Sequence, residues 1–319
     1  MSYYIVTTDN LYGLGYKRGQ EYEAQSVSQN GIVILDFGNP YHYNGNYGVI
    51  LLDYYNWPVV KFLFEIKDAS KQFAEGFWYG LGVDNASFLT IVVGTNNSGS
   101  HVTQGHGESW GIMINELNTW LANQGYDGQI KFVGGNDIET TWDFGPPNEA
   151  WAWVDGYSST ASSVSLLYNY GAANGCPENY PPTEPEVQYQ WNIDPQECPT
   201  ENWPPNVEKW DQEDVYHVSW GSLRAYPFPE IYNTLGANAQ QWYRIALYAK
   251  FEHGTTMEFR GTLSQFTACL QEPDPCYQTN NTAEAGHTQL YAWLSSDPYN
   301  RVKEPLYWIS DLMWYYGNP

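Results

Sequence analysis

Short runs of apolar and β-branched residues recur along the chain, and most of them end at a polar or acidic side chain. Runs of this length and composition predict buried strands. The sixth run is the poorest, because Pro227 and Pro229 interrupt it. The eight predicted strands span residues 31–38, 87–97, 129–135, 163–171, 215–221, 226–233, 256–265 and 305–312.

Amphipathic segments lie between several of these runs and predict helices. Apolar side chains fall three or four residues apart over 107–125, and Gly125 ends that helix. Asp68 suits the N-cap of a helix over 68–82. Two more helices are predicted over 238–254 and 285–297.

This alternation is typical of a (β/α)8 TIM barrel, an α/β fold in which eight parallel strands form a closed sheet. We expect one barrel domain over residues 1–319, with 1–30 as an N-terminal extension. Residues 2–8 could instead supply another strand or a plug under the barrel. We expect the Pro-rich residues 172–214 to form a loop insertion held by a disulfide.

Four cysteines, all in the second half, flank two loops that are rich in proline and acidic residues. Local pairing predicts the disulfides Cys176–Cys198 and Cys269–Cys276, which would restrict these loops. A zinc site is the alternative, but there is no CxxC motif and these loops contain no histidine. Disulfides imply an oxidising, extracellular compartment. The first residues lack the pattern of a signal peptide, so we expect a mature chain whose leader has been replaced.

The composition narrows the range of partners. The chain has 36 acidic and 13 basic residues, a net charge of −23, which disfavours binding to nucleic acid or anionic membranes. No apolar run is long enough to span a bilayer, so membrane insertion is not expected. The 15 Trp and 28 Tyr residues mostly serve a core, but such rings also stack on sugars. We therefore predict a carbohydrate partner, and leave the oligomeric state open.

Two carboxylates follow the third predicted strand. Active sites of parallel barrels form where the strands end at their carboxyl side. The segment GGNDIE (134–139) leads out of the strand, and alternation places Asp137 and Glu139 on one face. Neighbouring carboxylates disfavour joint ionisation, so one pKa rises, and a glycosidase needs a carboxylic acid of raised pKa. Bonds to backbone or arginine are at least an equally good explanation of such a pair.

Glu230 ends a different predicted strand, and we expect it to face the pair across the mouth of the barrel. We assign Glu139 as general acid/base, Glu230 as nucleophile or base, and Asp137 as the residue that tunes Glu139. Glu230 could instead cap the helix at 238–254 or bond Arg224.

Further polar and aromatic side chains at strand ends would bind sugar hydroxyls or stack on sugar rings. Asp36 and Asp311 should lie side by side where the first and eighth strands close the barrel, and we favour a binding role for them. Core packing is the commoner role for any one tryptophan. The predicted substrate-binding residues are Asp36, Asn96, Asn97, Trp142, Tyr168, Asn169, Trp220, Gln265 and Asp311.

No cofactor and no metal site is predicted. The chain has no GxSxG elbow, and GLGYKRG (13–19) does not join a strand to a helix as a phosphate loop must. His101 and His106 share a loop, but their spacing is not a metal signature. A hydrolase with a serine or cysteine nucleophile is therefore the least favoured class.

Several segments together resemble a known group of proteins. VVGTNNSG, GGNDIE, LYNYGAANGCP, VSWG, PEIYN, AQQW and FRGTLSQ, within about residues 31–311, resemble uncharacterised secreted bacterial proteins described as glycoside-hydrolase-like TIM barrels. The resemblance implies a barrel and secretion, without a substrate. DIE (137–139) is also similar to the D-x-E element of lysozyme-like and chitinase-like barrels, in which the Glu donates a proton and the Asp assists. The further aspartates of the chitinase signature are absent, so substrate-assisted chitin chemistry is not implied.

Two functional hypotheses follow. The first is a secreted glycoside hydrolase that acts on a polysaccharide or cell-wall glycan by carboxylate acid/base catalysis. The alternative is a non-catalytic secreted barrel that binds glycan or assembles with partners. The distance between the Glu139 and Glu230 carboxyl groups distinguishes the two hypotheses. A distance of about 5 Å fits a hydrolase that retains the anomeric configuration, about 6.5–9.5 Å fits one that inverts it, and a much longer distance fits binding alone.

Overall fold

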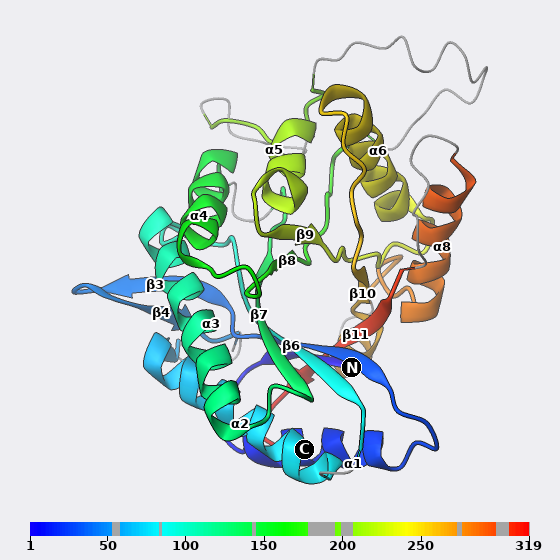
Figure 1. Cartoon of the computed structure of the whole chain (residues 1–319). Coiled ribbons are helices and arrows are strands. Elements are labelled where there is room, and N and C mark those ends of the chain that lie inside the picture. The colour runs from blue at the N-terminus through cyan, green and yellow to red at the C-terminus, as the bar shows by residue number, and fades with distance from the viewer. Residues whose placement is uncertain are drawn as a thin grey trace.

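Eight parallel strands form a nearly closed barrel at the centre of the molecule, which confirms the predicted α/β fold (Figure 1). The computed structural model describes residues 1–52, 58–82, 85–141, 145–177, 195–198, 207–272, 276–297 and 306–318. Around the barrel the strand order is β10-β11-β1-β2-β6-β7-β8-β9. The barrel strands are β1 (Ser2–Ile5), β2 (Asn30–Asp36), β6 (Phe88–Asn96), β7 (Ile130–Asp137), β8 (Leu167–Asn169), β9 (Ala225–Pro227), β10 (Gly261–Ser264) and β11 (Trp308–Tyr315).

Helices connect successive strands and cover the outside of the barrel (Figure 1). A small antiparallel sheet of β3 (Asn39–Tyr43), β4 (Asn46–Ile50) and β5 (Val60–Phe62) follows β2. The helices are α1 (Leu11–Glu23), α2 (Leu63–Leu81), α3 (Gln104–Gln124), α4 (Pro147–Thr160), α5 (Gln212–Tyr216), the π-helix η2 (His217–Gly221), α6 (Ala237–Glu252), α7 (Phe266–Gln271) and α8 (Ala283–Ser296).

The predicted number of strands was right, but two assignments were wrong. Residues 2–5 form β1, which pairs with both β11 and β2, so residues 1–30 are part of the barrel rather than an extension. Residues 215–221 form helix instead of a fifth strand. The Asp211 carboxylate accepts the N–H of Asp214 at 3.0 Å, and the Asp214 carboxylate accepts the N–H of Asp211 at 2.8 Å. This reciprocal cap starts a helix that runs on through the apolar VYHVSWG segment.

The helix predicted over 68–82 begins earlier, at Leu63, since the Glu65 carboxylate accepts the N–H of Phe62 at 3.0 Å. Asp68 therefore lies inside α2 and does not cap it.

The barrel closes between β9 and β10 through the segment that carries Glu230. Leu263 N–H donates to the Pro229 carbonyl, and Ile231 N–H donates to the Leu263 carbonyl, both at 2.9 Å. Glu230 thus pairs with Leu263 as an isolated parallel bridge. Pro227 and Pro229 have no N–H to donate, which explains why β9 is short and the closure is irregular.

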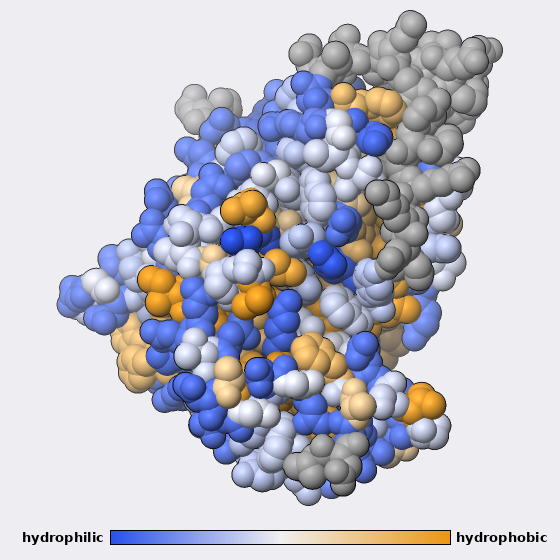
Figure 2. Space-filling model, viewed as in Figure 1, coloured by the Kyte–Doolittle hydropathy of each residue, from blue (hydrophilic) through white to orange (hydrophobic). Residues whose placement is uncertain are grey.

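Both predicted disulfides, Cys176–Cys198 and Cys269–Cys276, are present. Most of the predicted insertion at 172–214 lies outside the described residues. Within the described part of the chain, no helix has the length and apolarity that crossing a membrane requires. Polar residues cover most of the face in Figure 2, with apolar residues scattered among them.

The barrel interior is filled largely by apolar and aromatic side chains. Val133 and Tyr170 belong to this inner cluster, whereas Ile130, Phe132 and Ile138 pack in the outer layer, as the alternation along β7 predicts. The inner cluster comprises Tyr4, Ile32, Ile34, Leu52, Val92, Val133, Tyr168, Tyr170, Phe228, Leu263, Ala268 and Leu312.

Two glycines leave room for tyrosine rings beside the candidate carboxylates. A Cβ at Gly135 would contact Val92 and the ring of Tyr170, and a Cβ at Gly134 would contact Tyr157. The Tyr157 hydroxyl accepts the N–H of Gly134 at 3.1 Å. The glycines that precede Asp137 therefore serve packing against neighbouring tyrosines.

We expect Gly135→Ala to lower the free energy of unfolding by about 1–3 kcal/mol, because the added methyl group overpacks the space held by Tyr170. Urea unfolding measures this change. Gly128→Ala is the matched control, since a Cβ there meets no atom within 4 Å. Equal stability of the two variants would contradict the packing role.

Candidate active site

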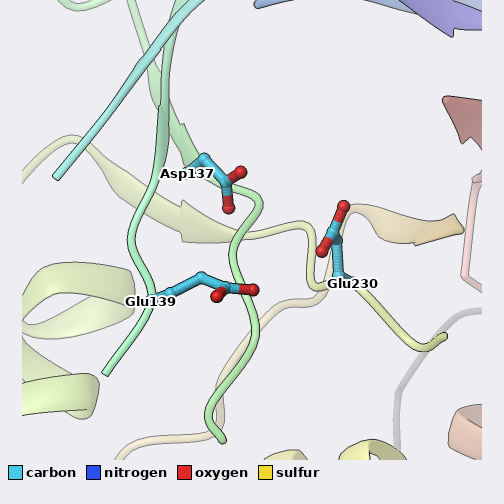
Figure 3. A group of neighbouring side chains, drawn as sticks. All are labelled: Asp137, Glu139 and Glu230. Atoms are coloured by element: carbon cyan, nitrogen blue, oxygen red, sulfur yellow. The ribbon is translucent and has the colours of Figure 1, made fainter. Parts of the chain in front are cut away.

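Three carboxyl side chains meet at the carboxyl end of the barrel strands (Figure 3). Asp137 ends β7, Glu139 follows two residues later, and Glu230 lies just after β9. One carboxyl oxygen from each residue lies within 4.8 Å of the other two. The structure therefore brings together the three residues predicted to be catalytic, although their roles remain a prediction.

Asparagine side chains hold the segment that carries Glu139. Asn97 at the end of β6 accepts the Glu139 N–H at 3.1 Å and donates to the Glu139 carbonyl at 2.9 Å. Asn169 at the end of β8 accepts N–H groups of Ile138 at 3.4 Å and of Gly171 at 3.1 Å. These hydrogen bonds hold the backbone in place beyond the last backbone pair of β7, and they fix the position of Glu139 after the end of that strand.

Tyrosine hydroxyls contact two of the carboxylates. Tyr4 on β1 donates to Glu230 over 3.4 Å, and Tyr232 donates to Glu139 over 3.5 Å. The nearby backbone N–H of Ala172 also lowers the pKa of the Glu139 carboxyl group. These donors favour the ionised form of each carboxylate.

The hydrogen bond from Tyr232 has a defined direction. Asn233 N–H donates to Asn238 Oδ1 at 2.9 Å, and Asn238 Nδ2 donates to Asn174 Oδ1 at 3.1 Å. Asn174 Nδ2 in turn donates to the Tyr232 hydroxyl oxygen. Because that oxygen accepts from Asn174, its own proton is directed to Glu139.

Burial dominates the electrostatics of the three carboxylates. Asp137 is 1% exposed and Glu230 is 2% exposed, whereas Glu139 is partly exposed. Burial raises the pKa of Asp137 and of Glu230 well above the usual range, and repulsion between the carboxylates raises both further. Burial raises the pKa of Glu139 to about 7, against the hydrogen bond from Tyr232 and the nearby N–H of Ala172. The ion pairs among the described residues do not involve these three groups.

Asp36 is a fourth buried carboxyl group, at the end of β2. Gly38 N–H donates to it at 3.0 Å. Burial raises its pKa to about 7, and the hydrogen bond from Gly38 opposes that rise. The expectation that Asp36 lies beside Asp311 was wrong, because β1 separates β2 from β11.

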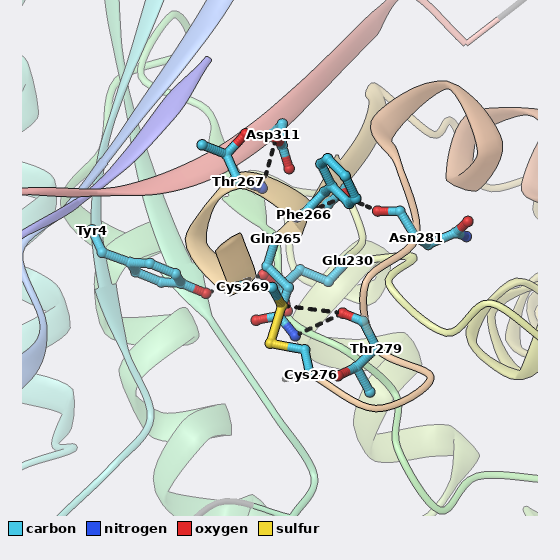
Figure 4. The surroundings of a disulfide bond; sticks show 11 residues. Tyr4, Glu230, Gln265, Phe266, Thr267, Cys269, Cys276, Thr279, Asn281 and Asp311 are labelled. Carbon is cyan, nitrogen blue, oxygen red and sulfur yellow. Dashed lines mark hydrogen bonds between the residues drawn. A yellow bond between two sulfur atoms is a disulfide. The ribbon is translucent and has the colours of Figure 1, made fainter. Parts of the chain in front are cut away.

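Asp311 supports the start of α7. Its carboxylate accepts the N–H of Thr267 at 3.0 Å and also the Thr267 hydroxyl (Figure 4). An acceptor at the first turn of a helix satisfies an N–H that has no partner within the helix. Asp311 is therefore engaged in holding α7.

The remaining predicted binding residues are divided between the mouth and other regions. Asn96 bonds Asn39 at 2.7 Å, and Gln265 follows β10 at the start of α7. Tyr168 is buried inside the barrel with its ring parallel to Phe228. Trp220 lies in η2, before the start of β9, and donates to Thr255 at 3.2 Å, so it does not follow the end of a strand. Trp142 lies outside the described residues.

Sequence reasoning missed the residues that contact the carboxylates. Tyr232 stands two positions after Glu230, and alternation along an extended segment could have placed both on one face. Tyr4 and Asn174 gave no such signal, because their contacts with Glu230 and Tyr232 join segments far apart in the chain.

The three carboxylates also offer the oxygen ligands that a hard divalent cation takes. Among the described residues this is the one group of three or more His, Cys, Asp or Glu side chains with such spacing.

No protein-family model matches the chain, and no curated protein matches it either. The barrel is compatible with a TIM-like fold, while the resemblance to glycoside-hydrolase-like proteins has no further support from these comparisons.

We expect Asp137→Asn to raise the Tm at pH 8. A carboxyl group whose folded pKa lies above its ordinary value of 3.8 destabilises the folded state increasingly as pH rises above that value. Each ~1 kcal/mol relieved corresponds to about 2–4 °C. The gain should shrink at acidic pH, where the carboxyl group is protonated in both states.

Scanning calorimetry across pH measures this difference. Asp127→Asn is the control, since Asp127 is exposed in the turn before β7. A loss of stability at pH 8 in Asp137→Asn would show that the Asp137 carboxylate stabilises the fold.

Proposed function

We propose that this protein is a glycoside hydrolase that acts on a polysaccharide or cell-wall glycan. The observation that carries the proposal is the meeting of Asp137, Glu139 and Glu230 from two strands at the mouth of one barrel. Glycoside hydrolysis commonly uses a pair of carboxyl groups on either side of the scissile bond, one as an acid and one as a base or nucleophile.

The environment of Glu139 suits a general acid/base. It is the most exposed of the three, and a pKa of about 7 lets it hold a proton near neutral pH and release it in the next step. The directed hydroxyl of Tyr232 would orient the group and stabilise it after the proton has left.

Glu230 is the proposed nucleophile. Negative charge on Glu139 is one of the causes that raise the pKa of Glu230, so protonation of Glu139 favours ionisation of Glu230. The Tyr4 hydroxyl supports negative charge on Glu230. Asp137 is buried beside both residues. Its electrostatic repulsion of Glu139 would change when Glu139 transfers its proton, and this change would tune the pKa of Glu139.

A secreted location accompanies this function. Two disulfides fit an oxidising compartment. The excess of acidic residues fits a glycan better than a polyanion as the partner.

The alternative is a barrel that binds glycan without cleaving it. The near-complete burial of Glu230 favours this function, because a substrate must reach the nucleophile to be cleaved. Hydrolysis by the wild-type protein distinguishes the two.

We expect Glu139→Gln to lower kcat by about 10²–10⁴-fold, since an amide cannot supply the proton. Glu230→Gln should abolish formation of the glycosyl-enzyme intermediate. Release of reducing ends from a panel of oligosaccharides measures both, with exposed Glu252→Gln as the control. If wild type is active and either variant keeps full activity, the role of that residue is wrong. If wild type cleaves no glycan, the binding function is favoured.

The distance between the carboxylates predicts retention of the anomeric configuration. One oxygen of Glu139 and one oxygen of Glu230 lie within 4.8 Å of each other, nearer to the about 5–5.5 Å of retaining enzymes than to the about 6.5–9.5 Å of inverting ones. Proton NMR of the first-formed product measures the anomer. An inverted product would rule out Glu230 as nucleophile and make it a base.

A further inference from the structure

A pocket lies at the carboxyl end of the barrel, and Tyr4 stands between it and Glu230. Its volume is about 170 Å³, smaller than the about 300–1,000 Å³ of sites that enclose drug-sized ligands. Tyr4 connects the pocket to the carboxylates, because its ring lines the pocket and its hydroxyl donates to Glu230 (Figure 4). One side chain, Tyr4, therefore separates the pocket from the proposed nucleophile.

Two aromatic rings line this pocket. Tyr4 on β1 and Trp314 on the neighbouring β11 have ring centroids 4.7 Å apart and planes tilted by 34°. The Cys269–Cys276 disulfide lines the pocket as well. Aromatic faces of this kind pack against the flat, C–H-rich faces of sugar rings.

The polar groups at the pocket are acidic or neutral. Gln265 and Glu272 line it, and among the described residues no Lys or Arg does. Beyond Tyr4 lie Glu230 and Asp137, and the buried Oδ1 of Asp137 has no hydrogen-bond partner among the described residues. Aromatic faces and carboxylates both attract an ammonium group.

We propose that this pocket receives a sugar unit that carries a protonated amine, so that the substrate is a polycationic amino-glycan. This inference rests on the proposed hydrolase and names its substrate class. The aromatic rings would contact the sugar ring, while the ammonium group faces Glu272 of the lining and, beyond Tyr4, the buried carboxylates. A glycan that carries carboxylate or sulfate groups would be repelled.

The charge of the site supports this class of ligand. Burial makes ionisation of Asp137 and Glu230 costly, and the described residues place no cation beside them to offset that cost. A ligand ammonium group would supply the missing charge, with little screening by salt in a buried setting.

The test compares three β-1,4-linked hexasaccharides that differ only at C2: cellohexaose, the hexamer of glucosamine and the hexamer of N-acetylglucosamine. Calorimetric titration into Glu139→Gln avoids turnover. We expect the glucosamine hexamer to bind at least about tenfold more tightly than the other two, at a pH at which its amines are protonated. Equal or tighter binding of cellohexaose, or no binding of any hexamer, would overturn the proposal.

Variants of α7 test the pocket itself. Ala268→Leu places a larger side chain into the pocket and should lower affinity for the glucosamine hexamer by about tenfold or more. Leu270→Ala, on the same helix but 70% exposed and outside the pocket lining, should leave it unchanged. Gln265→Ala serves as the second pocket variant if Ala268→Leu does not fold. Affinity in the pocket variant equal to that of Leu270→Ala would place the ligand elsewhere.

Failure of this inference differs from failure of the proposed function. If wild type hydrolyses a neutral glycan and Glu139→Gln does not, the hydrolase stands and the amino-glycan is wrong. If wild type hydrolyses no glycan, the hydrolase fails, even where the glucosamine hexamer binds in the pocket.

Discussion

The burial of several carboxyl groups that have no basic partner among the described residues is the constraint on which the candidate site depends. The side chains of Asp137 and Glu230 are almost fully buried, and so is that of Asp36 at the end of β2. The side chain of Glu139 is partly exposed. Enclosure of such groups costs free energy, which appears as pKa values raised above their usual range. A fold keeps such a feature only if the rest of its packing is stable enough to carry it, and perturbed carboxyl groups of this kind are common where chemistry occurs.

The surrounding structure limits that cost with neutral donors. Tyr4 and Tyr232 each donate a hydroxyl to a carboxylate, and the orientation of Tyr232 is set by Asn174. Tyrosine and asparagine stabilise negative charge without cancelling it, whereas a lysine or arginine would hold the carboxylate permanently ionised. A carboxyl group that must both hold and release a proton near neutral pH needs neutral neighbours such as tyrosine and asparagine.

The irregular part of the barrel is also the part that forms the site. β8 has only three residues, and β9 stops at Pro227, so the sheet between β7 and β10 is short. Glu230 lies in the segment that closes this gap, where a single bridge to Leu263 replaces a regular ladder. Asn169 joins the end of β7 to Ser219 of η2 and supports the same region. Side chains thus replace backbone pairing where the carboxylates converge.

The sequence by itself determined the local features: the buried strands β2, β6, β7 and β10, the face that Asp137 shares with Val133, the nearby cysteine pairs and the acidic surface. Each depends on residues close together in the chain, where periodicity and spacing carry the information. The sequence pattern wrongly predicted a strand at 215–221, because an apolar run without a clear period fits a strand and a helix equally well. The N-cap at Asp211 stabilises the helix there. Only the tertiary structure decided that β1 separates Asp36 from Asp311 and that Tyr4 reaches Glu230. The pairing of β1 with β11 and the bond from Tyr4 to Glu230 join residues more than two hundred positions apart, and closure of the barrel, rather than any local preference, sets them.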